Sequence, residues 1–119
     1  MIDYHIEAAQ RINKESDDYK IEVFLTGSFK EELFKSFCDY WFTNYDQEIK
    51  YLKEPNENMG TAGGLLYFEK QILGDSSPDT KIMVMNADIC SSFPLTTFLK
   101  FHESCTRKGG RGFYFIFIF

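Results

Sequence analysis

Apolar and polar residues alternate along this 119-residue chain with two different periods, and these periods predict its strands and helices. Residues 21–25 alternate and are rich in β-forming side chains, which predicts a strand. Between residues 29 and 45 the apolar positions recur every three to four residues, which predicts a long amphipathic helix whose apolar stripe faces the core. The same spacing over residues 1–12 predicts that the chain opens with a helix.

The second half of the chain repeats this order of strand and helix. Strands are predicted at 49–52 and 81–85, and helices at 60–73 and 94–105 follow them. Strands that alternate with helices are typical of an α/β fold with a parallel sheet. The final run, 113–119, is apolar and uncharged, so it predicts a strand at most, and an aggregation hazard if it lies at an exposed sheet edge.

The composition indicates one globular domain or a piece of one. Hydrophobic residues make up 44% of the chain and aromatic residues 18%, which is enough for a core. The net charge of -5 and the scattered lysines and arginines argue against a nucleic-acid surface. The longest apolar run is shorter than the ~20 residues that a membrane-spanning helix needs, so a membrane is not expected as a partner either.

The cysteines, the tryptophan and one histidine are better explained by packing than by chemistry. Cys38, Cys90 and Cys105 are widely spaced, form no C-x-x-C motif and follow no secretory leader, which predicts reduced thiols in a cytoplasmic protein. Cys90 lacks partner ligands and is assigned no role. Trp41 could stack on a base, but its helical spacing favours packing. His102 has no second ligand at metal spacing, which favours packing over metal binding.

Two loops carry the candidate chemistry. The first runs from Tyr51-Leu-Lys-Glu54 to a glycine cluster at 60–64 that opens a helix. Unpaired N–H groups at a helix N-terminus bind anions, and glycines let a flat or anionic ligand approach closely. The second loop presents Asp88 just beyond the predicted strand 81–85, where a carboxylate could hold a divalent cation. If the strands are parallel, both loops leave the same carboxyl edge, which favours a nucleotide site; the glycines are equally well explained as turn residues.

Four segments carry a resemblance to a known family. They are Met1-Ile-Asp-Tyr-His-Ile-Glu-Ala8, Tyr51-Leu-Lys-Glu54, Gly60-Thr-Ala-Gly-Gly-Leu65 and Asn86-Ala-Asp-Ile-Cys-Ser-Ser-Phe-Pro-Leu95. With them the sequence resembles the sugar-nucleotide pyrophosphorylases, and among these the alpha type of mannose-1-phosphate guanylyltransferase. The resemblance implies a partial three-layer, Rossmann-like nucleotidyltransferase domain over residues 1–108. It leaves 109–119 as an apolar tail or terminal strand that could be non-native sequence.

The resemblance also implies a reaction. Such enzymes join a nucleoside triphosphate to a sugar 1-phosphate with release of pyrophosphate, using Mg²⁺ or Mn²⁺; here GTP and mannose 1-phosphate would give GDP-mannose. One alternative is a non-catalytic regulatory subunit that binds GDP-mannose and controls a catalytic beta-type subunit. Another is a truncated product without function of its own. The family's G-x-G-T-R phosphate loop is expected upstream of Met1, so the 119 residues alone are expected to be inactive.

The resemblance assigns roles to individual residues of the two loops. Those expected to contact the nucleotide are Glu54, Gly60, Thr61, Ala62, Gly63, Gly64 and Ala87. Asp88 matches the carboxylate that holds the metal, and no residue is assigned as catalytic. Glu54 lies in the base-side segment, where a carboxylate accepting from the N1 and N2 hydrogens of guanine would select guanine over adenine.

Overall fold

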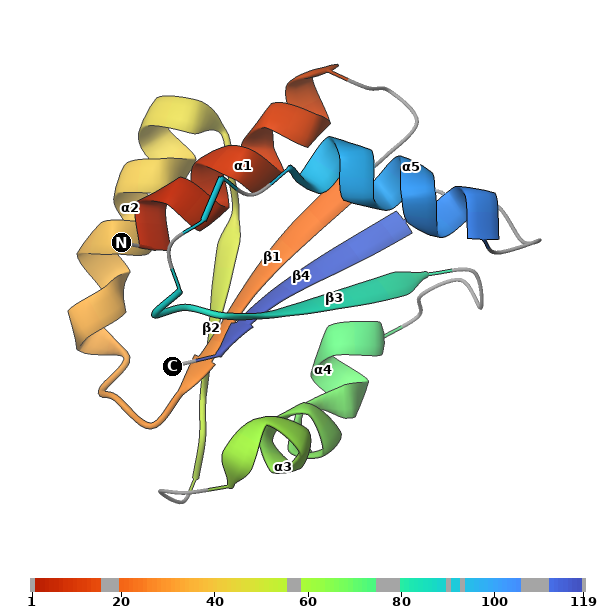
Figure 1. Cartoon of the computed structure of the whole chain (residues 1–119). Coiled ribbons are helices and arrows are strands. Elements are labelled where there is room, and N and C mark those ends of the chain that lie inside the picture. Colours follow the sequence, from red (N-terminus) through yellow and green to blue (C-terminus); the bar gives the residue numbers. More distant parts are fainter. Residues whose placement is uncertain are drawn as a thin grey trace.

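A computed structural model describes residues 2–15, 20–55, 59–74, 80–89, 91–92, 94–105 and 112–118 of the chain (Figure 1). Its elements are, in order, α1 (Ile2–Glu15), β1 (Lys20–Gly27), α2 (Glu32–Tyr45), β2 (Ile49–Lys53), α3 (Gly60–Tyr67), α4 (Glu69–Leu73), β3 (Lys81–Asn86), α5 (Leu95–Cys105) and β4 (Gly112–Ile118). Every predicted strand and helix is present, and the helix expected at 60–73 is divided at Phe68. Cys90 lies outside the described residues.

The four strands form one parallel sheet in the order β2-β1-β4-β3. β4 therefore lies inside the sheet, where it pairs with β1 on one side and β3 on the other. Interior strands of parallel sheets typically read as continuous apolar runs, which accounts for the uncharged sequence of this strand. The run at 113–118 is thus a strand, as its composition predicts, and it is removed from the exposed edge where it would invite aggregation.

Helices cover both faces of the sheet, so the fold has three layers (Figure 1). Along β1, Val23 and Leu25 join the core shared with α1, α2 and α5, whereas Phe24 packs with Phe68 and Ile72 on the side of α3 and α4. This division follows from the strand geometry, since successive side chains point to opposite faces. The α/β, partial Rossmann-like fold expected from the sequence is confirmed.

The apolar stripe of α2 is covered only in part. Trp41 is buried in the main core, which confirms its packing role, and Phe34 and Phe37 are half-buried. Leu33 and Phe42 are exposed, so the prediction that the whole stripe faces the core is wrong. The reason is the position of α2 over β2, the outermost strand of the sheet, where the described elements cover only one side of the helix.

Polar side chains attach α1 to the sheet. Asn13 Oδ1 accepts from the backbone N–H of Ile21 at 2.8 Å, while its Nδ2 donates to the Ile21 carbonyl at 3.1 Å. The same Nδ2 lies 3.3 Å from Gln47 Oε1. Near the other end of the helix, buried His5 donates from Nε2 to the Asn86 carbonyl at 3.2 Å, because a carbonyl oxygen can only accept. These bonds fix α1 against β1 and the end of β3.

None of the helices in the described part of the chain is long and apolar enough to cross a membrane. The half-buried thiol of Cys38 has a raised pKa, chiefly because burial disfavours its thiolate and also because Asp39 is close. A thiol that stays protonated is a weak nucleophile, which agrees with a packing role for this cysteine.

Replacing Asn13 should destabilise the fold. Asn13→Ala leaves the backbone N–H and C=O of Ile21, near the start of β1, without their side-chain partner, and we expect a loss of about 1–3 kcal/mol in the free energy of unfolding. Asn44→Ala is the matched control, because Asn44 is exposed and its side chain donates to the Tyr40 carbonyl within the same helix. Urea titration followed by circular dichroism measures both, and equal losses in the two variants would contradict the anchoring role.

Candidate functional site

The glycine segment opens α3 as the sequence predicts. Gly60 is the first helical residue and has φ of +66°, a backbone conformation that favours glycine. No atom lies within 4 Å of a Cβ built there, so the backbone itself accounts for this glycine. Thr61 and Ala62 are exposed beside it, and Met59 at the N-cap makes no side-chain capping bond. The first-turn N–H groups are therefore not capped by that side chain.

Glu54 and Gly64 lie in direct contact although they belong to different predicted segments. Glu54 follows β2 and is buried, and a Cβ added at Gly64 would lie 2.6 Å from its Oε1 and 3.4 Å from its Cδ. The missing side chain at Gly64 thus makes room for a carboxylate of the protein itself. Gly63 differs, since its added Cβ would meet Met59 Cβ at 3.3 Å within the helix start.

Backbone and tyrosine bonds hold the segment that carries Glu54. The N–H of Glu54 donates to the Gly27 carbonyl at 2.8 Å, which extends the pairing of β1 with β2 by one residue. The Tyr51 hydroxyl lies 2.8 Å from the Phe29 carbonyl and 3.1 Å from the Gly27 carbonyl, and its single proton can serve either. Burial raises the pKa of Tyr51, and the Glu54 carboxylate raises it further, so the hydroxyl remains a donor at neutral pH.

The second candidate loop follows β3, which is the strand at the other side of the sheet from β2. Ala87 is buried in the main core, so it presents almost no surface to a ligand. Asp88 is exposed just beyond it, and the bond from His5 to the Asn86 carbonyl fixes the chain immediately before. Of the two site residues predicted on this loop, Ala87 therefore packs in the core, and Asp88 has an exposed carboxylate.

The two loops share the carboxyl edge of the sheet but are not adjacent. Because β1 and β4 lie between β2 and β3, the strand ends that carry Glu54 and Asp88 are separated by three strand spacings, about 14 Å in all. Figure 1 shows α3 against one face of the sheet while the chain after β3 turns toward α5 on the other. A single ligand could contact both loops only by extending across the ends of β1 and β4.

Asp88 is the candidate metal ligand at the end of β3. Among the residues that the structure describes, no group of three or more histidine, cysteine, aspartate or glutamate side chains could hold a metal ion. Mg²⁺ commonly binds through one or two carboxylates and completes its coordination with water and substrate phosphates. One exposed carboxylate therefore fits a metal that arrives with a phosphate ligand and does not fit a metal held by the protein alone.

Thr26 is a polar residue at this edge that sequence reasoning missed. It is only 1% exposed at the end of β1, and its Oγ1 has no hydrogen-bond partner in the described part of the protein. By strand alternation it shares the face of Phe24, which α3 and α4 cover. The only signal in the sequence is a hydroxyl that follows the apolar run of a buried strand, and a buried hydroxyl without a partner is costly.

Comparison with known proteins places this Rossmann-like α/β domain in a family. No family profile matches the sequence. Curated relatives do: a probable mannose-1-phosphate guanyltransferase of Schizosaccharomyces pombe is 38% identical over 105 residues, which are 87% of this chain and 23% of the relative.

Two further relatives carry alpha-type names. The mannose-1-phosphate guanylyltransferase regulatory subunit alpha of Dictyostelium discoideum is 35% identical over 92% of this chain and 26% of its own length. The mannose-1-phosphate guanyltransferase alpha-A of Xenopus laevis is 35% identical over 98% of this chain and 25% of its own length. The chain belongs to the mannose-1-phosphate guanylyltransferase family, and it spans about a quarter of the length of these relatives.

The match with the Xenopus relative extends over 117 residues and so takes in most of β4. The division of the chain at 108/109 remains a prediction from the sequence.

The conformation of Gly60 leads to a stability test. Gly60→Ala forces a Cβ into the left-handed region, and we expect it to lower the free energy of unfolding by about 1–2 kcal/mol. Gly60→Asn should cost less, because asparagine tolerates this region better than other residues with a side chain. Thermal unfolding of the two variants measures the difference, and an unchanged stability of Gly60→Ala would show that the positive φ is not needed.

Proposed function

We propose that the chain is the nucleotide-recognising part of an alpha-type regulatory subunit, which binds GDP-mannose and controls a catalytic beta-type subunit in the cytoplasm. The observation that carries this proposal is the similarity, over 92% of the chain, to a relative named as a regulatory alpha subunit. Regulatory binding demands recognition of the ligand but no transfer chemistry. The net charge of -5 suits that role better than the neutralisation of a triphosphate, for which basic groups are needed.

The contact between Glu54 and Gly64 supports recognition of guanine. The carboxylate is held beside the first turns of α3, where Gly60, Thr61 and Ala62 are exposed. A carboxylate accepts two hydrogen bonds from the N1 and N2 groups of guanine, whereas adenine offers no donor at those positions. The proposal therefore places the base against the start of α3, with Glu54 as the group that discriminates between the purines.

The same proposal assigns the diphosphate end of the ligand to the second loop. Asp88 would bind Mg²⁺ or Mn²⁺, and the metal would supply charge neutralisation for the phosphates. The distance of about 14 Å between the two strand ends suits an extended nucleotide sugar that crosses the ends of β1 and β4.

Catalysis is the second candidate, favoured by the 38% identity to a relative named as a guanyltransferase. In that reaction a phosphate oxygen of mannose 1-phosphate forms a bond to the α-phosphorus of GTP, and the bond from this phosphorus to the pyrophosphate oxygen breaks. We expect no GDP-mannose from the purified 119-residue chain supplied with GTP, mannose 1-phosphate and Mg²⁺. Formation of GDP-mannose would favour the catalytic candidate over the regulatory one.

Base discrimination is tested by isothermal titration of the chain with GDP-mannose and ADP-mannose in Mg²⁺. We expect GDP-mannose to bind more tightly, and Glu54→Gln to weaken it about 10–100-fold, since hydrogen bonds to a charged group contribute about 1.5–3 kcal/mol. Glu48→Gln is the matched control, because Glu48 is an exposed carboxylate on the approach to β2. Equal affinity for the two ligands would refute guanine recognition by this chain.

Metal binding is tested with Asp88→Asn. We expect the wild-type chain to bind GDP-mannose more weakly after addition of a chelator, and the variant to bind with the same reduced affinity whether or not Mg²⁺ is present. Asp39→Asn on α2 is the control, because Asp39 is exposed and away from this edge. A variant that retains the full response to Mg²⁺ would remove Asp88 from the proposal and leave the base-side assignment to be judged on its own titration.

A further inference from the structure

Gly64 is the buried residue of α3, and its own backbone does not explain why it is a glycine. It lies inside the helix, and among the described glycines a positive φ is found at Gly60 and Gly74 but not at Gly64. A glycine inside a helix is less favourable than an alanine, because its unfolded backbone has more freedom to lose. The reason for a glycine at this position therefore lies outside the helix backbone.

The contact of Gly64 with Glu54 involves the carboxyl group alone. A Cβ added at Gly64 would lie 2.6 Å from Oε1 of Glu54, which is far inside van der Waals contact. Apart from the backbone of α3 and the chain neighbours of Gly64, the described part of the protein places no other residue within 4 Å of that Cβ. A side chain at this position would therefore displace the carboxylate and leave the helix in place.

The backbone of Glu54 is not free to follow its displaced side chain. Its N–H donates to the Gly27 carbonyl at 2.8 Å, and the strand before it pairs with β1 as far as Lys53. The side chain is also buried, and close packing leaves it few alternative rotamers. A displaced carboxylate therefore points in a new direction, whereas a group that recognises a ligand must be held within about 0.5 Å of its working position.

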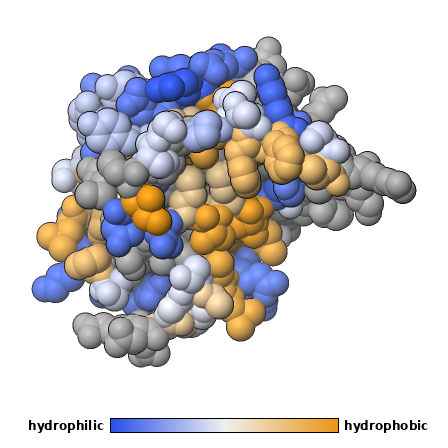
Figure 2. Space-filling view, viewed as in Figure 1, coloured by the Kyte–Doolittle hydropathy of each residue, from blue (hydrophilic) through white to orange (hydrophobic). Residues whose placement is uncertain are grey.

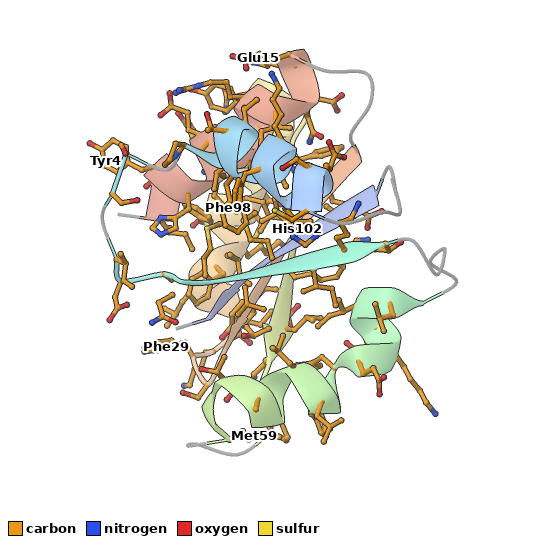
Figure 3. The ribbon with its side chains drawn as sticks, turned by 45° about the vertical axis from the view of Figure 1, so that its right-hand side comes forward. Tyr4, Glu15, Phe29, Met59, Phe98 and His102 are labelled. Carbon is orange, nitrogen blue, oxygen red and sulfur yellow. The ribbon has the colours of Figure 1, made fainter. Side chains whose placement is uncertain are left out.

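The two sides of α3 differ in their surroundings. Figure 3 shows Met59 at the start of this helix, on the face of the sheet away from α5. Gly64 is buried toward the sheet, whereas Leu66, two residues later, is exposed. Figure 2 shows hydrophobic residues gathered over β3 and α4, next to α3. A substitution at Leu66 thus changes the same helix without meeting Glu54.

We infer that Gly64 sets the base preference of the chain as a positioning residue, which acts on the ligand through the Glu54 carboxylate. This inference rests on the proposed recognition of guanine by Glu54. The family resemblance leads instead to a direct contact between Gly64 and the nucleotide. A side chain that blocks a direct contact would weaken every nucleotide, whereas one that displaces Glu54 weakens only the ligand that Glu54 recognises.

The first test is isothermal titration of Gly64→Ala with GDP-mannose and with ADP-mannose in Mg²⁺. We expect GDP-mannose to bind about tenfold more weakly than to the wild-type chain and ADP-mannose to bind as before, since the displaced carboxylate loses hydrogen bonds to guanine alone. Leu66→Ala is the control on the same helix and should leave both affinities unchanged. Equal weakening of the two ligands by Gly64→Ala would assign Gly64 a direct contact and overturn the inference.

A double-mutant cycle shows whether Gly64 acts through Glu54. Once Glu54→Ala has removed the carboxylate, the addition of Gly64→Ala should not weaken GDP-mannose further. Melting temperatures followed by circular dichroism give a second reading without ligand. In the Glu54→Ala background, Gly64→Ala should raise the melting temperature by about 4 °C through its better helix propensity, and the rise should be smaller when Glu54 is present.

Equal shifts of the melting temperature in the two backgrounds would overturn the inference, because the two residues would then not be coupled. A Gly64→Ala chain that fails to fold would also overturn it, since the helix and not the carboxylate would have given way. Equal affinity of the wild-type chain for the two ligands refutes guanine recognition and this inference together. A wild-type preference for GDP-mannose that Gly64→Ala retains leaves the proposed function in place and overturns the role of Gly64 alone.

Discussion

The sheet depends on β4, because β1 and β3 form no ladder with each other and are joined only through it. Its pairing is non-local, with Lys20 opposite Gly112 and Thr26 opposite Ile118. Because β4 pairs with β1 on one side and with β3 on the other, it sets the distance between β1 and β3. The contact of α1 with α5 and the bond from His5 to the Asn86 carbonyl both require that distance.

This constraint also sets the dimensions of the candidate site. Glu54 and Gly64 come together because β2 and α3 are consecutive and pack on the same face, close to Phe24 and its partners. Asp88 lies on the same carboxyl edge but follows the strand on the other side of the sheet, since β4 and β1 lie between β3 and β2. In the proposed function this arrangement would serve a long ligand, with the base beside α3 and the phosphates beside the end of β3.

The two edges of the sheet differ in how they meet solvent. At β2, α2 packs over one face of the strand, and Lys50 forms an ion pair with Glu22 of β1 at 3.1 Å. At β3 the side chains that point away from the core are Ile82 and Val84, and the adjoining helix adds Phe98. Among the described residues, the surface at β3 is thus more apolar than the surface at β2.

Local patterns in the sequence were enough to predict the order of strands and helices, though not the division of α3 from α4 at Phe68, since amphipathic periods and turn residues act between near neighbours. Turn residues also predicted the glycine start of α3, while the family was indicated by the resemblance of four segments. Local patterns did not indicate that Leu33 and Phe42 would be exposed or that Thr26 would be buried without a partner. The order of the strands and the separation of Glu54 from Asp88 were decided only by the tertiary structure, because they depend on pairing between residues far apart in the chain, which no local pattern specifies. The contact of Glu54 with Gly64 was decided by how α3 packs against the sheet beside β2.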